Sequence, residues 1–286
     1  MTVRVQLIVT GELERLGLHL SLRKLFASTG ADVEFLEPQK TQDFTSNRVG
    51  ALLPPELASK SLAAKLARAL VLAVYPGRGG TMQADHVIAV DDLELVNADQ
   101  PGHVLEYFRH AVRAHVDSTF PTATTRDRVY QALAERGSFH LLAPMAESYF
   151  FGEAAALQRA KAHQATNRFD TARDLEDFEV DDAAYLAPAP STAPWKAEPR
   201  HRHPKNYVRY LCDPTGTQLR TYRETHEGLE ALQVLDWTAV LRQEAHAAFA
   251  RALIDDVADA LNVPSPCPGT CSPLTMRKGD GLLRNI

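Results

Sequence analysis

Hydrophobic and polar positions follow two different periods along the first half of the chain. Short apolar runs predict strands, and longer segments with apolar residues three or four positions apart predict helices. In residues 12–27, for example, Leu13, Leu16 and Leu20 lie close to one helix face. The expected order is strand 3–9, helix 12–27, strand 32–36, helix 57–74, strand 86–90, helices 102–116 and 126–135, strand 138–143 and helix 153–163. This order predicts an α/β fold in which helices flank a mostly parallel sheet.

The second half of the chain has a different pattern. Five prolines between residues 187 and 205 predict an irregular segment that crosses the surface. Residues 236–262 predict one long helix or two abutting helices, with Asp236 as the N-cap. The polar residues 39–50 are expected to form a mobile loop. We therefore expect an α/β domain at 1–186, the crossing segment at 187–205, a helical portion packed on the same unit at 206–263, and a poorly ordered tail at 264–286.

Composition limits the classes of protein to consider. The chain has 286 residues, of which 45% are hydrophobic, and a net charge of −5. This charge does not suggest general polyanion binding, although a local basic groove is compatible with it. The longest apolar stretch, residues 63–75, contains Lys65 and Arg68 and cannot cross a bilayer. No signal peptide is recognisable, so we expect a cytoplasmic protein with no membrane partner. The oligomeric state is left open.

The three cysteines do not predict a structural site. Their odd number argues against a disulfide framework. Cys267 and Cys271 form a close pair, but no second pair completes a four-ligand zinc site.

Acidic residues follow two of the expected strands, at the point where each apolar run stops. Glu12 and Glu14 follow the strand at 3–9, and Asp91, Asp92 and Glu94 follow the strand at 86–90. The carboxyl ends of parallel strands meet at one edge of a sheet, where ligands bind in open α/β folds. Carboxylates gathered there repel one another unless a hard cation lies between them. The pattern predicts a Mg²⁺ (or Mn²⁺) site, with a solvated acidic loop as the alternative.

Two further residues are candidates for the same chemistry. Glu147 is a single acid in the apolar stretch 144–152, so we expect it to be functional or paired, for instance with an arginine. Lys205 ends the densest basic cluster, residues 200–205. This cluster suits a phosphate-contacting loop or, equally, a solvated linker.

The acidic motifs also carry a resemblance. Val9-Thr10-Gly11-Glu12-Leu13-Glu14 and Val90-Asp91-Asp92-Leu93-Glu94 resemble the two acidic motifs of Toprim-fold proteins. With the stretches 144–152, 203–207 and 222–237, the chain resembles a Toprim-related bacterial domain-of-unknown-function family, often found beside ATPases in defence clusters. Two positions depart from the Toprim pattern. Thr10 stands where a glutamate usually precedes the glycine. The second motif, usually Asp-x-Asp, reads Asp92-Leu93-Glu94, or else Asp91 with Leu93 in the second acidic position.

The resemblance implies a Toprim-like (Rossmann-like) fold and a divalent-metal-dependent nuclease that acts on nucleic acid, as an antiviral defence effector. Glu12, Glu147 and Lys205 would be catalytic. The ligands of Mg²⁺ or Mn²⁺ would come from Glu12, Glu14, Asp91, Asp92 and Glu94. The alternative, favoured by Thr10, is a catalytically inactive Toprim-like subunit that docks an ATPase or another partner.

Overall fold

A parallel β-sheet forms the centre of the protein. The computed structural model describes residues 2–50, 61–77, 80–163, 166–217, 221–275 and 281–286. The sheet has the order β2–β1–β4–β5, and β3 pairs in parallel with the end of β1 beyond β2. The strands are β1 (Val3–Val9), β2 (Val33–Phe35), β3 (Gln39–Lys40), β4 (His86–Asp92) and β5 (Gly137–Leu142). The predicted α/β architecture with a mostly parallel sheet is confirmed.

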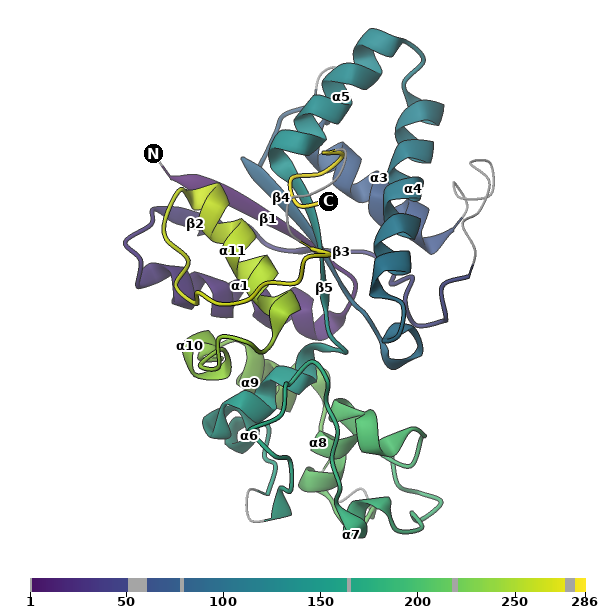
Figure 1. Cartoon of the computed structure of the whole chain (residues 1–286), viewed down its shortest axis with the longest axis vertical. Helices are drawn as coiled ribbons and strands as arrows, with labels where there is room; N and C mark the ends of the chain where they lie inside the picture. The colour runs from purple at the N-terminus through teal and green to yellow at the C-terminus, as the bar shows by residue number, and fades with distance from the viewer. Residues whose placement is uncertain (1, 51–60, 78–79, 164–165, 218–220, 276–280) are drawn as a thin grey trace.

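Helices cover both faces of this sheet (Figure 1). On one face, α1 (Glu12–Ala27) and α11 (Ala248–Leu261) pack against apolar residues such as Leu7 and Val90. On the other, α3 (Leu62–Val74), α4 (Pro101–Thr119) and α5 (Ala123–Arg136) pack against Ile8 and Phe139. Burial on both faces explains why residues 7–9 of β1 and 87–90 of β4 are continuously apolar. Within the described ranges, no helix has the length and apolar content needed to span a membrane.

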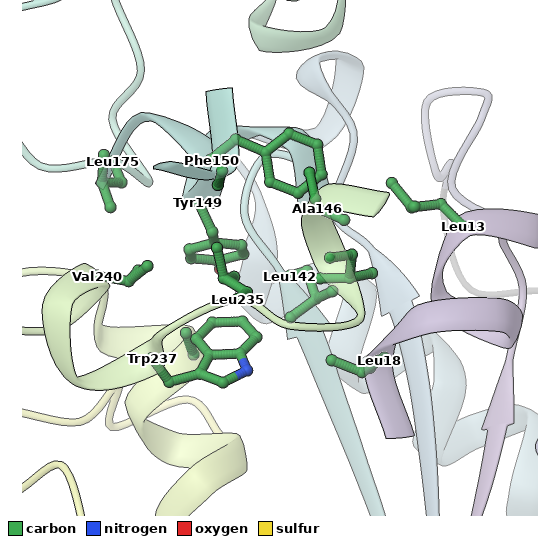
Figure 2. Close-up of a cluster of buried hydrophobic side chains, with 14 of the residues drawn as sticks. Leu13, Leu18, Leu142, Ala146, Tyr149, Phe150, Leu175, Leu235, Trp237 and Val240 are labelled. Carbon is green, nitrogen blue, oxygen red and sulfur yellow. The ribbon is translucent and has the colours of Figure 1, made fainter. Parts of the chain in front are cut away.

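Short helices from the second half of the chain lie beyond the carboxyl end of β5, in the lower part of Figure 1. Trp237 and Tyr149 from this region belong to the same buried cluster as Leu18 of α1 and Leu142 of β5 (Figure 2). The indole nitrogen of Trp237 also donates a 3.1 Å hydrogen bond to Ser21 Oγ. The helices of this region are η2 (Ala146–Gly152), α6 (Ala154–Arg159), α7 (Ala183–Leu186), η4 (Arg200–Arg202), α8 (Pro204–Cys212), η5 (Glu224–Gly228), α9 (Leu229–Leu232) and α10 (Trp237–Val240). Of these, η2 and η4 are 3-10 helices and η5 is a π-helix; a further 3-10 helix, η1 (Leu95–Asn97), follows β4. This region therefore packs on the sheet unit, as predicted.

The expected helix at 236–262 is divided into two separate helices. Asp236 caps α10 as predicted, because its side chain accepts hydrogen bonds from the backbone of Thr238 and Ala239. The chain then leaves the helix, and α11 begins only at Ala248. The buried Arg251 guanidinium donates to the carbonyls of Leu241, Gln243 and His246, which lie in the intervening segment. A continuous or abutting helix is therefore the wrong prediction.

The prediction of a poorly ordered tail is wrong for residues 281–286. The Asn285 side chain accepts a 3.1 Å hydrogen bond from Phe139 N and donates one of 2.6 Å to Phe139 O. Arg284 N donates to the carbonyl of Gly137. This segment therefore covers the outer side of the edge strand β5, where unpaired backbone groups would otherwise be exposed.

Two other segments differ from the expectation. The end of the polar segment 39–50 is anchored by Asn97, which donates to Thr45 O and accepts from Val49 N. The proline-rich segment contains η4, and its last proline, Pro204, is the first residue of α8. Proline suits this position because its missing N–H would have no partner within the helix. The expected helix at 57–74 overlaps α3, and residues 57–60 lie outside the described residues.

Candidate functional site

A polar pocket of about 170 Å³ lies at the carboxyl ends of β1 and β4, against the short helices of the second half. It confirms the predicted meeting of the two acidic segments at one edge of the sheet. Its lining residues are Thr10, Gly11, Leu13, Glu14, Asp43, Ser46, Asp91, Asp92, Glu94, Glu147, Lys205 and Glu224.

Glu14 is the residue of the first acidic segment that enters this pocket. It lies in the first turn of α1 and is only 5% exposed. Its Oε2 atom folds back over Gly11, so close that a Cβ atom at position 11 would lie 1.7 Å from it. Burial, followed by the charge of Glu147, raises the pKa of Glu14 to about 8. Glycine at position 11 is thus what allows this carboxylate to face the pocket.

Glu12 does not line the pocket, which corrects its expected place in the site. Its carboxylate forms ion pairs with Arg15 at 2.6 Å and Lys40 at 2.9 Å. The hydrogen bonds from Arg15 and then Lys40 lower the pKa of Glu12 to about 2. Residues two positions apart point to different sides of a helix, so only one of Glu12 and Glu14 can face the pocket. The helical period alone could have separated these two acids.

Asp91 is buried, and its oxygens are already engaged by neighbouring groups. Oδ1 accepts hydrogen bonds from the Thr10 hydroxyl and from Asp92 N, and Oδ2 accepts one from Phe44 N. Burial raises the pKa of Asp91 to about 7, although these hydrogen bonds favour the charged form. Asp91 therefore joins β1, β4 and the segment around Phe44 at the wall of the pocket.

Asp92 and Glu94 line the pocket together with Asp91. Because β4 ends at Asp92 and Glu94 lies beyond it with a φ of 61°, the alternation of strand residues does not explain the position of Glu94. Oδ1 of Asp92 is buried and has no hydrogen-bond partner among the described residues. Burial and then the charges of Glu14 and Glu94 raise the pKa of Asp92 well above its usual value. Burial also raises the pKa of Glu94 to about 7, although the charge of Lys205 opposes this shift. Neither carboxylate forms an ion pair with a basic side chain in the described part of the chain.

Glu147 and Lys205 meet in the pocket with a residue that the sequence reasoning did not single out, Glu224. Lys205 Nζ lies 2.8 Å from Glu224 Oε1 and 3.7 Å from Glu147 Oε1. The Tyr222 hydroxyl donates a 3.2 Å hydrogen bond to Glu147 Oε1. The charge of Glu147 is the largest factor that raises the pKa of Lys205. Among the described residues, the buried Glu147 thus pairs with a lysine and a tyrosine, and not with the expected arginine.

The remainder of the basic cluster 200–205 is partly structural. The Arg200 guanidinium is buried and donates to the carbonyls of Tyr185, Leu186 and Ala187, at the end of α7. Arginine beside helix-terminal carbonyls is a common way to satisfy them. Asp43 and Ser46 are also lining residues that the sequence reasoning missed, because no periodic pattern marks the polar segment 39–50.

Acidic groups thus outnumber basic ones around the pocket. Glu14, Asp92, Glu94, Glu147 and Glu224 line it with Lys205, and no other lysine or arginine is among its described lining residues. In this arrangement, no three described histidine, cysteine, aspartate or glutamate side chains are grouped so as to hold one metal ion. Comparison with known proteins finds no matching family model, no similar curated protein and no similar solved structure.

Proposed function

We propose that this chain is a Toprim-related phosphodiesterase that cleaves nucleic acid with Mg²⁺ or Mn²⁺, and that Glu14, Asp92 and Glu94 supply the ligands. One observation supports this most strongly. Carboxylates from two distant parts of the chain, the buried Glu14 and the half-buried Asp92 and Glu94, line one pocket, where desolvation and mutual repulsion raise their pKa values. A divalent cation bound there would relieve that repulsion.

The donor set fits such a cation. Carboxylate oxygens are the ligands that hard cations prefer, and Asp92 Oδ1 is buried without a partner among the described residues. Mg²⁺ usually keeps several waters and takes one or two carboxylates directly, so the three acids need not all touch it. Asp91 supports the site without being a ligand in this proposal, because its oxygens already accept hydrogen bonds. When bound, the cation would neutralise phosphate charge and acidify a water molecule.

The other pocket residues have separate tasks in this proposal. Glu147 accepts a proton from the attacking water, and Tyr222 and Lys205 fix its carboxylate. Lys205 donates to a phosphate oxygen, and its loss should slow cleavage by about a hundredfold. Glu12 has no task, because Arg15 and Lys40 hold it outside the pocket.

A second function is favoured by a specific observation. Thr10 takes the place of the usual acid, and Glu12 is engaged elsewhere, so the first motif brings only Glu14 to the pocket. A non-catalytic Toprim-like subunit that docks an ATPase would tolerate this smaller number of acidic ligands. A role in antiviral defence, as nuclease or as docking subunit, follows from the resemblance and is part of the same proposal.

The matched acids Glu12 and Glu14 allow a direct test. Mn²⁺ binding is measured by calorimetry and electron paramagnetic resonance, and cleavage is measured on DNA and RNA, single- and double-stranded. We expect Glu14→Gln to weaken Mn²⁺ binding at least tenfold and to abolish cleavage, while Glu12→Gln changes neither. Absence of Mn²⁺ binding in the unmodified chain would contradict the metal site. Mn²⁺ binding without cleavage of any of these substrates would favour the docking subunit.

A further inference from the structure

The pocket already contains one cation, the ammonium group of Lys205. It lies between Glu147 of η2 and Glu224 of η5, at 3.7 and 2.8 Å. The lysine side chain is 25% exposed and that of Glu147 only 2%, so the ion pair with Glu147 is screened less than a surface pair would be.

This position of Lys205 is not favoured by its own helix. Lys205 is in the first turn of α8, directly after Pro204, where the helix dipole disfavours positive charge. His203 provides the N-cap, because its ring accepts from Asn206 N, so Lys205 has no capping task. The two carboxylates are therefore what holds the ammonium group in place.

Asp43 and Asp91 accept hydrogen bonds from Ser46 and Thr10, and the other acids of the pocket divide into two groups. Glu147 and Glu224 pair with Lys205, whereas Glu14, Asp92 and Glu94 form no ion pair with a described residue at this distance. The second group includes Asp92 Oδ1, which is buried and without a partner in the described part of the chain. Enzymes with two cations use them to stabilise both the attacking and the leaving oxygen of a phosphate. A lysine ammonium can supply one of these positive charges as a point charge.

We propose that Lys205 takes the place of the second cation, so that the chain binds one divalent cation, beside Glu14, Asp92 and Glu94. This inference rests on the proposed function, since it presumes that the pocket binds a divalent cation at all. It adds the stoichiometry of the site. An ammonium group has three N–H donors, so Lys205 can hold its two carboxylates and also contact a phosphate oxygen.

Counting bound Mn²⁺ ions tests this inference. The unmodified chain should bind one Mn²⁺ ion per molecule. Lys205→Met frees Glu147 and Glu224, so this variant should bind two, with spin coupling between them in its electron paramagnetic resonance spectrum. Lys205→Arg keeps the charge and should bind one. Lys40→Met is the matched control, because Lys40 pairs with Glu12 outside the pocket, and it should also bind one.

The outcomes separate this inference from the proposed function. Two Mn²⁺ ions in the unmodified chain, or one in Lys205→Met, would overturn the inference and leave the metal site intact. No Mn²⁺ in any variant would overturn both. If Lys205→Met does not fold, Lys205→Gln replaces it and should also bind two Mn²⁺ ions. The double variant Lys205→Met with Glu147→Gln locates the second ion. It should bind only one Mn²⁺ ion, because Glu147 would be a ligand of the second.

Discussion

The Thr10 hydroxyl donates a hydrogen bond to Oδ1 of Asp91, and this bond ties the end of β1 to the end of β4. Thr10 is only 7% exposed and Asp91 only 2%. Thr10, which stands where the Toprim resemblance would place a glutamate, therefore holds Asp91 of the second acidic segment. Thr10 acts in this structure as a scaffold residue of the pocket.

Replacing Thr10 tests this scaffold role. Thr10→Val keeps the shape of the side chain but leaves a buried carboxylate oxygen with one donor fewer. We expect the free energy of unfolding to fall by about 1–3 kcal/mol, measured by urea denaturation. Thr10→Ser retains the hydroxyl, so its free energy of unfolding should fall clearly less than that of Thr10→Val. Equal losses in the two variants would show that the methyl group, and not the hydrogen bond, is what matters.

The acidic pocket should make the metal-free protein less stable as the pH rises. Folding raises the pKa of Glu14 to about 8, above its ordinary value of 4.5. Between these values the folded state holds a proton that the unfolded state has lost. Stability is therefore highest below about pH 4.5 for this group and falls as the pH rises to about 8, by about 1.4 kcal/mol per pH unit for one such group.

Melting temperatures in a chelator between pH 5 and 8 measure this effect. Glu14→Gln removes the titrating group and should flatten the slope, whereas Glu12→Gln should not. Mg²⁺ should raise the melting temperature most at pH 8, because it binds the ionised carboxylates. A melting temperature that rises with pH in the chelator would contradict the inferred direction.

The C-terminal segment should contribute to stability through Asn285. Its amide side chain satisfies both backbone groups of Phe139 on the outer side of β5. Asn285→Ala leaves two buried backbone groups without these partners, and we expect a loss of about 2–4 kcal/mol in the free energy of unfolding. Gln131→Ala, on the exposed side of α5, is the control and should change stability by less than about 0.5 kcal/mol. Comparable losses in the two variants would contradict the assigned role.

The sequence predicted what depends on local pattern. The bounds of β1 and α1 follow from an apolar run and a helical period, and the order of strands and helices predicts the parallel sheet. Placing Glu14, Asp92 and Glu94 at one edge needed only this topology. The choice between Glu12 and Glu14 also follows from the helical period, because residues two positions apart point to different sides of a helix.

The remaining features depend on contacts between distant residues. The helix at 236–262 is interrupted where Arg251 binds backbone carbonyls, and α11 begins where Glu176 accepts hydrogen bonds from Phe249 N and Ala250 N. No local pattern places Glu176 at that helix end. The same is true of Glu224 beside Lys205 and of Asn285 on β5, because each contact joins residues that are far apart in the sequence.

Gly11 provides a way to change the pocket with little effect on the fold. Its backbone is extended, with φ −86° and ψ 153°, so alanine can adopt it without strain. The added Cβ would, however, displace the Glu14 carboxylate, which is the end of a flexible side chain. We expect Gly11→Ala to cost about 0.5–1 kcal/mol of stability as a weaker N-cap, and to weaken Mn²⁺ binding at least tenfold.

Gly17→Ala, on the same helix, is the matched control with the opposite expectation. A Cβ atom there would lie 3.1 Å from the side chain of Leu232, in the core and away from the pocket. Overpacking should lower its stability by about 1–3 kcal/mol, while Mn²⁺ binding of the folded protein stays unchanged. Calorimetric titration and thermal melts of both variants separate the two effects. If Gly11→Ala bound Mn²⁺ as tightly as the unmodified chain, the position of the Glu14 carboxylate would not affect metal binding. The assignment of Glu14 as a ligand would then be wrong.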